Sequence, residues 1–321
     1  MYEITIVTAL FDIGREQFKN TIYNRSIETY IEHFKFWARI QNELIIYTQS
    51  KLAKTILEVR ESFGLGNRTR IIIVDDFHEK NRAIYERMCK VEKNSQYALW
   101  GINPKALRNR ADYDYVMLMK YWCLNEAAGL LNEKAVLAWL DFGYNNGGDF
   151  FIQPEEFAFS WREQLFFEDR RIHIFTFFDP DDVLLCESLQ MMYVCAMGGM
   201  VIVPKELCAE LWELMKQAME SLLMLDAIDD DQQLLVMAYK YRPEIFSVHQ
   251  MPQGKWFLPL KEYGGKHLTC RSEREDTALR NFREKHFLKH RRLKEKRHSD
   301  ELGKELAERI YKAADKYYRY R

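Results

Sequence analysis

The sequence lacks several features that would assign it to a class of protein at once. No stretch approaches about 18 uncharged apolar residues, so we predict no transmembrane helix. The first residues, MYEITIVTALFDIGR, have neither the basic n-region nor the small-residue cleavage site of a signal peptide. The six cysteines include no C-x-x-C pair and most lie in apolar runs, which predicts reduced thiols in a cytoplasmic protein.

The composition is that of an ordinary soluble globular protein, with 47% hydrophobic and 30% charged residues. A length of 321 residues suits one large α/β domain with an appendage. The charge is unevenly spread, because residues 271–321 hold 17 Lys and Arg against 10 Asp and Glu while the whole chain has a net charge of −1. An acidic body with a basic tail indicates that the tail meets an anionic surface.

Apolar runs and helical periodicity alternate along the chain. Strands are predicted at 3–10, 43–49, 70–77, 135–144, 170–179 and 193–204, and from 245 into a Pro/Gly turn. Helices are predicted at 24–40, 52–66, 78–92, 111–130, 205–225 and 226–243. This alternation predicts an α/β fold with a mostly parallel, Rossmann-like sheet and helices on both faces. We expect one catalytic domain over 1–270 and a basic helical extension over 271–321.

One predicted strand, AVLAWL, ends at Asp141 and is followed by a glycine-rich turn. The letters D-F-G at 141–143 also occur in protein kinases. The chain has no H-R-D and no G-x-G-x-x-G, however, so we interpret the tripeptide as a chance match. In open parallel sheets, ligands bind outside the carboxyl ends of the strands. A nucleotide across these ends would meet Thr8, Leu10, Asp12, Arg15, Asp76 and Asp141, with a metal ion on Asp141.

Four segments carry a resemblance to a known family. IVTALFDIGR, MLMKYWCLNEA, AWLDFGYN and GGMVIVPKE are similar to the HtrL/YibB proteins, which are found near bacterial surface-polysaccharide genes. That family in turn resembles glycosyltransferases of the GT-A fold. The resemblance spans roughly residues 3–260 and implies a GT-A-like domain.

The resemblance implies a divalent metal, Mn²⁺ or Mg²⁺, under the donor pyrophosphate. GT-A enzymes usually carry D-x-D at this strand end, whereas this chain has D-F-G, so the second carboxylate is absent. The stretch VHQMPQGKW resembles the H-x5-K-P-W stretch of retaining GT-A enzymes. It suggests His249 as a metal ligand beside Asp141, and Lys255 at the pyrophosphate. The alternative is a strand-end histidine and a surface lysine.

The same resemblance suggests residues around the sugar. In DDDQQLL, Asp231 and Gln232 are the candidate catalytic residues, with Asp231 as a general base or as a stabiliser of an oxocarbenium-like centre. A helix cap alone would also explain these acids. The Gly198–Gly199 pair and Tyr144 would contact the acceptor or sugar. Lys120 would place its positively charged ammonium at the nucleotide-sugar donor. A β-bulge, a core aromatic and a snorkelling lysine are the corresponding alternatives.

The expected function is a metal-assisted glycosyltransferase of the hexosyltransferase class. It would use a UDP-sugar or similar donor and a bacterial surface glycan, such as lipopolysaccharide, O-antigen or capsule. The alternative is a non-catalytic nucleotide- or glycan-binding protein. The basic stretch 283–297 suggests peripheral contact with anionic lipid on the inner face of the inner membrane. A solvated helix, a dimer contact or unspecific nucleic-acid binding would also explain it, and no specific nucleic acid is expected.

Overall fold

The computed structural model describes residues 3–17, 24–94, 110–162, 169–191 and 194–272. The predictions for the basic stretch 283–297 lie outside these residues. The chain divides into two compact units, Met1–Thr269 and Cys270–Arg321. The expected roles of the two parts, catalytic domain and basic extension, stay predictions. Within the described ranges, no helix combines the length and the apolarity that a bilayer crossing requires.

The first unit is built on a seven-stranded sheet with the order β3-β2-β1-β4-β6-β5-β7. The strands are β1 (Thr5–Leu10), β2 (Leu44–Thr48), β3 (Thr69–Ile73), β4 (Val136–Leu140), β5 (Ile172–Thr176), β6 (Met200–Pro204) and β7 (Phe246–Gln250). Neighbouring strands are parallel except that β6 runs antiparallel to both β4 and β5. The predicted α/β class with a mostly parallel sheet is confirmed.

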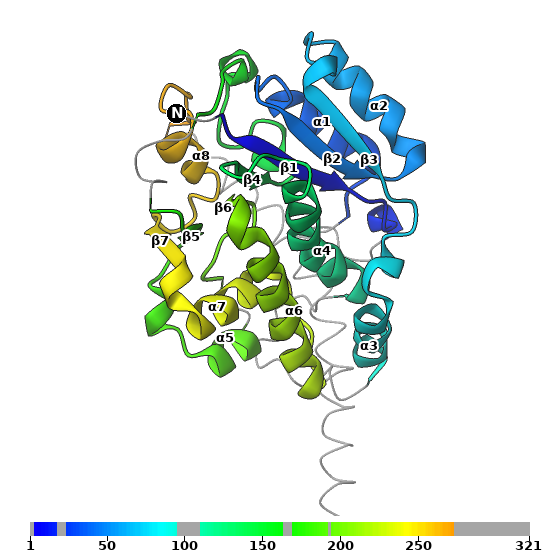
Figure 1. Ribbon diagram of the computed structural model, residues 1–321, viewed down its shortest axis with the longest axis vertical. Helices are drawn as coiled ribbons and strands as arrows, with labels where there is room; N and C mark the ends of the chain where they lie inside the picture. Colours follow the sequence, from blue (N-terminus) through cyan, green and yellow to red (C-terminus); the bar gives the residue numbers. More distant parts are fainter. Residues whose placement is uncertain (1–2, 18–23, 95–109, 163–168, 192–193, 273–321) are drawn as a thin grey trace, which may run out of the picture. The chain divides into compact units, whose positions relative to one another are not determined.

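Helices lie on both sides of the strands, with α1 and α2 above them and α4 and α6 below them in Figure 1. The helices are α1 (Ile27–Trp37), α2 (Ser50–Glu61), α3 (Arg82–Lys93), α4 (Ala111–Ala128), α5 (Leu185–Met191), α6 (Cys208–Met224), α7 (Asp231–Tyr241) and α8 (Leu258–Tyr263). The strand expected over 193–204 is confirmed only for its second half, because the Gly198–Gly199 turn precedes β6. The short helices α5 and α8 were not predicted.

Helix α4 is buried on almost every side, and this decides the environment of its one lysine. Its buried residues include Tyr115, Leu118, Lys120 and Leu124, which do not share a single narrow face. A helix that is apolar all round belongs in a protein interior. Lys120 is therefore carried into the core and must find its hydrogen-bond acceptors there.

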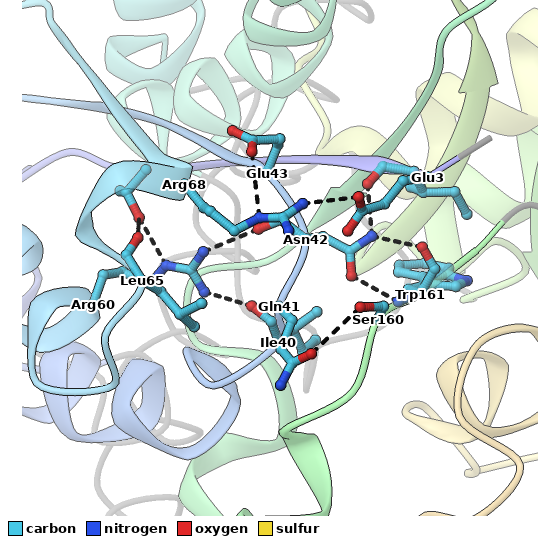
Figure 2. Close-up of polar contacts among 12 residues, drawn as sticks. Glu3, Ile40, Gln41, Asn42, Glu43, Arg60, Leu65, Arg68, Ser160 and Trp161 are labelled. Atoms are coloured by element: carbon cyan, nitrogen blue, oxygen red, sulfur yellow. Dashed lines mark hydrogen bonds and ion pairs between the residues drawn. The ribbon is translucent and has the colours of Figure 1, made fainter.

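A buried arginine ties α2 to the loop before β2. The Arg60 side chain is 1% exposed and donates to the backbone carbonyls of Ala38, Ile40 and Asn42 at 2.6–3.0 Å. Figure 2 shows this guanidinium beside the Asn42 amide, which in turn bonds the backbone of Trp161. Hydrogen bonds to a charged donor contribute more than neutral ones, so Arg60 fixes the segment before β2 against α2.

Candidate functional site

Strand β4 delivers Asp141 to the carboxyl edge of the sheet. All five residues of β4 are buried, and the ladder to β6 continues one step further, since the Asp141 N–H donates to the Gly199 carbonyl at 3.0 Å. From β1 the sheet extends one way to β2 and the other way to β4. Such a change of direction opens the crevice where α/β sheets bind ligands. Asp141 lies at this position, and its side chain is 39% exposed.

A tryptophan and a lysine hold one oxygen of the Asp141 carboxylate. Oδ1 accepts a hydrogen bond from Trp139 Nε1 at 2.7 Å and lies 2.9 Å from Lys120 Nζ. Trp139 lies two positions before Asp141, so both side chains point to the same face of the chain. Among the described residues, no hydrogen bond reaches the second oxygen, Oδ2. This oxygen therefore has no donor among the described residues, on a side chain that is 39% exposed.

Lys120 joins three segments that are distant in sequence. Its Nζ donates to Asp231 Oδ2 at 2.8 Å and to the Gly198 carbonyl at 3.0 Å, in addition to its contact with Asp141. Its side chain is 4% exposed. Burial alone would lower the pKa of Lys120, but the two carboxylates outweigh it and hold that pKa above its usual value. The ammonium is therefore charged and uses all three of its donors.

The acids at the start of α7 have different roles. Asp230 is the N-cap, since its side chain accepts a hydrogen bond from the Gln232 N–H at 3.0 Å. Asp231 follows it, is 1% exposed, and faces Lys120 and the Tyr121 hydroxyl. Burial raises the pKa of Asp231, and the Lys120 ammonium opposes that change. The cap explanation therefore holds for Asp230, whereas Asp231 belongs to the lysine cluster.

The glycine pair is placed between the two carboxylates. A Cβ on Gly198 would lie 2.0 Å from Asp231 Oδ2, whereas a Cβ on Gly199 would lie 3.6 Å from Asp141 Oδ2. Only glycine at position 198 allows the backbone to approach Asp231 this closely. Gly198 thus lets Asp231 reach Lys120, whereas a Cβ at position 199 would make only an ordinary contact. The Lys120 cluster is defined as Lys120, Asp141, Asp231, Gly198 and Gly199.

Two basic residues lie on segments next to this cluster. Arg15 hydrogen-bonds the Tyr30 hydroxyl and stacks over Tyr113 of α4 at 5.1 Å, and Tyr30 contacts Gly143 of the D-F-G turn. On another segment, the Tyr144 hydroxyl donates to the Phe257 carbonyl at 3.0 Å, two residues beyond Lys255. Tyr144 itself is buried next to Gly199.

Other residues expected at the nucleotide are placed differently. Thr8 and Leu10 are buried within β1. Asp12 forms an ion pair with Lys51 at 2.6 Å and accepts a hydrogen bond from the Gly14 N–H. Asp76 follows β3, three strands from β4, and accepts from the Glu79 N–H. Among the described residues, no hydrogen bond or ion pair joins these four side chains to the Lys120 cluster, and their role at a nucleotide stays a prediction.

The expected metal pair of Asp141 and His249 does not form in the structure. His249 lies on β7, three strands from β4, so the two are about 14 Å apart at roughly 4.8 Å per strand. Both of its ring nitrogens have partners, His173 at 2.8 Å and the Tyr263 hydroxyl at 3.0 Å. The part of the chain that the structure describes contains no group of three or more acidic, histidine or cysteine side chains able to hold a metal. These residues do not fit the expected metal.

Some neighbours of the cluster were not foreseen. Trp139, Tyr121 and Asp114 were not singled out from the sequence. Asp114 of α4 is fully buried, and among the described residues neither of its carboxylate oxygens has a hydrogen-bond partner. Burial, and then Asp229 and Asp230, hold the pKa of Asp114 well above its usual value, which favours the neutral carboxyl. The period-two spacing from Asp141 was a signal for Trp139, but no local pattern marks the other two.

The model of a family described as "Bacterial protein of unknown function (HtrL_YibB)" matches residues 2–263. Protein HtrL of Escherichia coli strain K12 is 28% identical over 271 residues, which cover 79% of this chain and 90% of that protein.

Two solved structures of glycosyltransferases are similar at low identity. Mouse xyloside xylosyltransferase 1 in its apo form has a TM-score of 0.39 and 11% identity, and the match covers 84% of this chain and 95% of that one. A glycosyltransferase involved in glycosylation of the major capsid of PBCV-1 has a TM-score of 0.37 and 12% identity, with 86% and 98% covered.

Proposed function

This chain belongs to the HtrL_YibB family, and from that premise we propose that it is a glycosyltransferase that uses a nucleotide-sugar donor. The observation that carries the proposal is the position of Asp141. A half-exposed carboxylate, held on one oxygen by Lys120 and Trp139, lies at the switch point of a mostly parallel sheet. Such a crevice suits a nucleotide ligand, and the four segments that resemble the HtrL/YibB proteins include this strand end.

The charges near the cluster suit transfer from a diphosphate. When the glycosidic bond to the donor breaks, negative charge develops on the nucleoside diphosphate, and positioned cations stabilise it. Arg15 and Lys255 are the candidates for this role on the two flanking segments. Oδ2 of Asp141 would accept a hydrogen bond from a sugar hydroxyl. In this proposal the donor is a UDP-sugar and the acceptor is a bacterial surface glycan.

The binding alternative has one observation in its favour. Asp231, the expected catalytic base, is 1% exposed and engaged by Lys120, so it does not face an acceptor in this conformation. A protein that binds nucleotide or glycan without turnover would need only the crevice and Asp141. The roles of Asp231 and Gln232 in catalysis therefore stay predictions.

A panel of UDP-, GDP-, CDP- and dTDP-sugars tests the proposal. Wild-type protein should release nucleoside diphosphate from one donor class and be stabilised against heat by that diphosphate. Asp141→Asn should lower the release by about 100-fold, as expected for loss of a positioned polar group. Asp182→Asn changes an exposed carboxylate in the 3-10 helix after β5; it is the matched control and should behave as wild type. Thermal stabilisation without release from any donor would favour the binding alternative.

A further inference from the structure

Three oxygens from three different segments surround the Lys120 ammonium. They belong to the Asp141 carboxylate after β4, the Gly198 carbonyl before β6 and the Asp231 carboxylate at the start of α7, at 2.8–3.0 Å from Nζ. Two carboxylates and one carbonyl are the hard oxygen ligands that Mg²⁺, Mn²⁺ or Ca²⁺ takes in proteins. In this chain, a lysine from helix α4 occupies the centre of that oxygen set.

An ammonium at this centre excludes a divalent ion. A metal bound by the same oxygens would lie about 2.0–2.6 Å from each of them, in the volume that Nζ occupies. Lys120 is 4% exposed and is carried by a helix buried on most sides, so it has no solvent-filled space into which to withdraw. The lysine also supplies positive charge opposite the two carboxylates, which removes the electrostatic reason for a metal at this position.

We propose that the Lys120 ammonium is the resident cation of this site and stands in place of a divalent metal. Ligand binding at Asp141 is then independent of metal. The inference rests on the proposed function only where it concerns catalysis. Lys120 is a positioning residue, because its three donors are already used and it touches no ligand itself. It holds Oδ1 of Asp141 and leaves Oδ2 to accept a hydrogen bond from a ligand such as a sugar hydroxyl.

Binding of Mn²⁺ to metal-stripped protein tests this directly. The readouts are the thermal midpoint, with and without Mn²⁺, and the free Mn²⁺ signal in electron paramagnetic resonance. Wild-type protein should show no Mn²⁺ site that depends on Asp141. Lys120→Met removes the ammonium and should lower the midpoint by about 10 °C, since it leaves two buried carboxylates without their counter-charge. Mn²⁺ should then bind the emptied oxygens and recover part of the loss, and adding Asp141→Asn should abolish that recovery.

The matched control is Lys54→Met, which changes a lysine that is 89% exposed and should leave the midpoint unchanged with or without Mn²⁺. A Mn²⁺ site in the wild-type protein that disappears in Asp141→Asn would overturn the proposal. A folded Lys120→Met variant that does not bind Mn²⁺ would also contradict it. If Lys120→Met does not fold, the Mn²⁺ titrations of the wild-type protein and Asp141→Asn still test whether the wild-type protein has a metal site at Asp141.

The donor assay separates this inference from the proposed function. Release of nucleoside diphosphate by the wild-type protein in excess EDTA, at the rate seen with Mn²⁺, supports both. Release that requires Mn²⁺ keeps the glycosyltransferase function and overturns the role of Lys120. Absence of release with every donor removes the glycosyltransferase function, while the Mn²⁺ titrations still test the lysine.

Discussion

The substitution Gly198→Ala tests the geometry of the Lys120 cluster with a single methyl group. The added Cβ would lie 2.0 Å from Asp231 Oδ2 and 2.5 Å from its Cγ, so the carboxylate must move by more than an ångström. The position has no left-handed backbone, so the effect is steric alone. Overpacking a core typically costs about 1–3 kcal/mol, and separating a buried carboxylate from its ammonium costs about 3–5 kcal/mol.

We therefore expect Gly198→Ala to lower the free energy of unfolding by about 4 kcal/mol, measured by urea denaturation. Gly199→Ala is the matched control, since its Cβ would meet nothing closer than 3.6 Å and its effect should stay within about 1 kcal/mol. In an Asp231→Ala background the cost of Gly198→Ala should shrink, because the clashing atoms are gone. Equal effects of the two alanines would refute the described contact between Gly198 and Asp231.

Three further predictions concern other parts of the first unit. Burial lowers the pKa of His173 to about 4 and also lowers the pKa of His249, whereas the unfolded chain protonates imidazoles near pH 6.5. Stability should therefore fall as the pH drops from about 6.5 toward 4, and the double variant His173→Gln/His249→Gln should show a flatter pH dependence in urea unfolding. Arg60→Met leaves three carbonyls without their donor and should cost about 3 kcal/mol, against little change for the exposed Arg70→Met. Tyr144→Phe removes a 3.0 Å hydrogen bond and should lower the thermal midpoint by the equivalent of about 1 kcal/mol; an unchanged midpoint would contradict that bond.

The buried acids around α7 show how much this cluster depends on one lysine. Asp231 and Asp114 are both buried, and Lys120 is the cation that contacts Asp231 and Asp141 together. Removing an ammonium from such a place leaves like charges close together in a medium of low dielectric. The variant Lys120→Met therefore tests whether these oxygens can bind Mn²⁺ once the lysine that pairs with them is removed.

The amino-acid sequence by itself determined the class of fold and the chemistry that reaches the sheet edge. Apolar runs with helical or alternating spacing are local signals, and they predicted the strands and most of the helices. A carboxylate directly after a buried strand must lie at the strand's carboxyl end, so Asp141 was predictable. A lone charge in an apolar helix marked Lys120, and a glycine pair in an apolar run marked Gly198 and Gly199.

Only the tertiary structure decided which of these side chains meet. Lys120 and Asp231 are 111 positions apart, and no local pattern states that α4 and α7 pack so that the two touch. Strand order placed His249 three strands from Asp141, although a motif suggested that they share a metal. Side-chain pairing across distant segments follows from packing and from the burial of charge, which act on the whole fold. For that reason His249, which we expected to bind a metal, pairs with His173. Lys120, which we expected to contact the nucleotide-sugar donor, lies instead at the centre of the cluster.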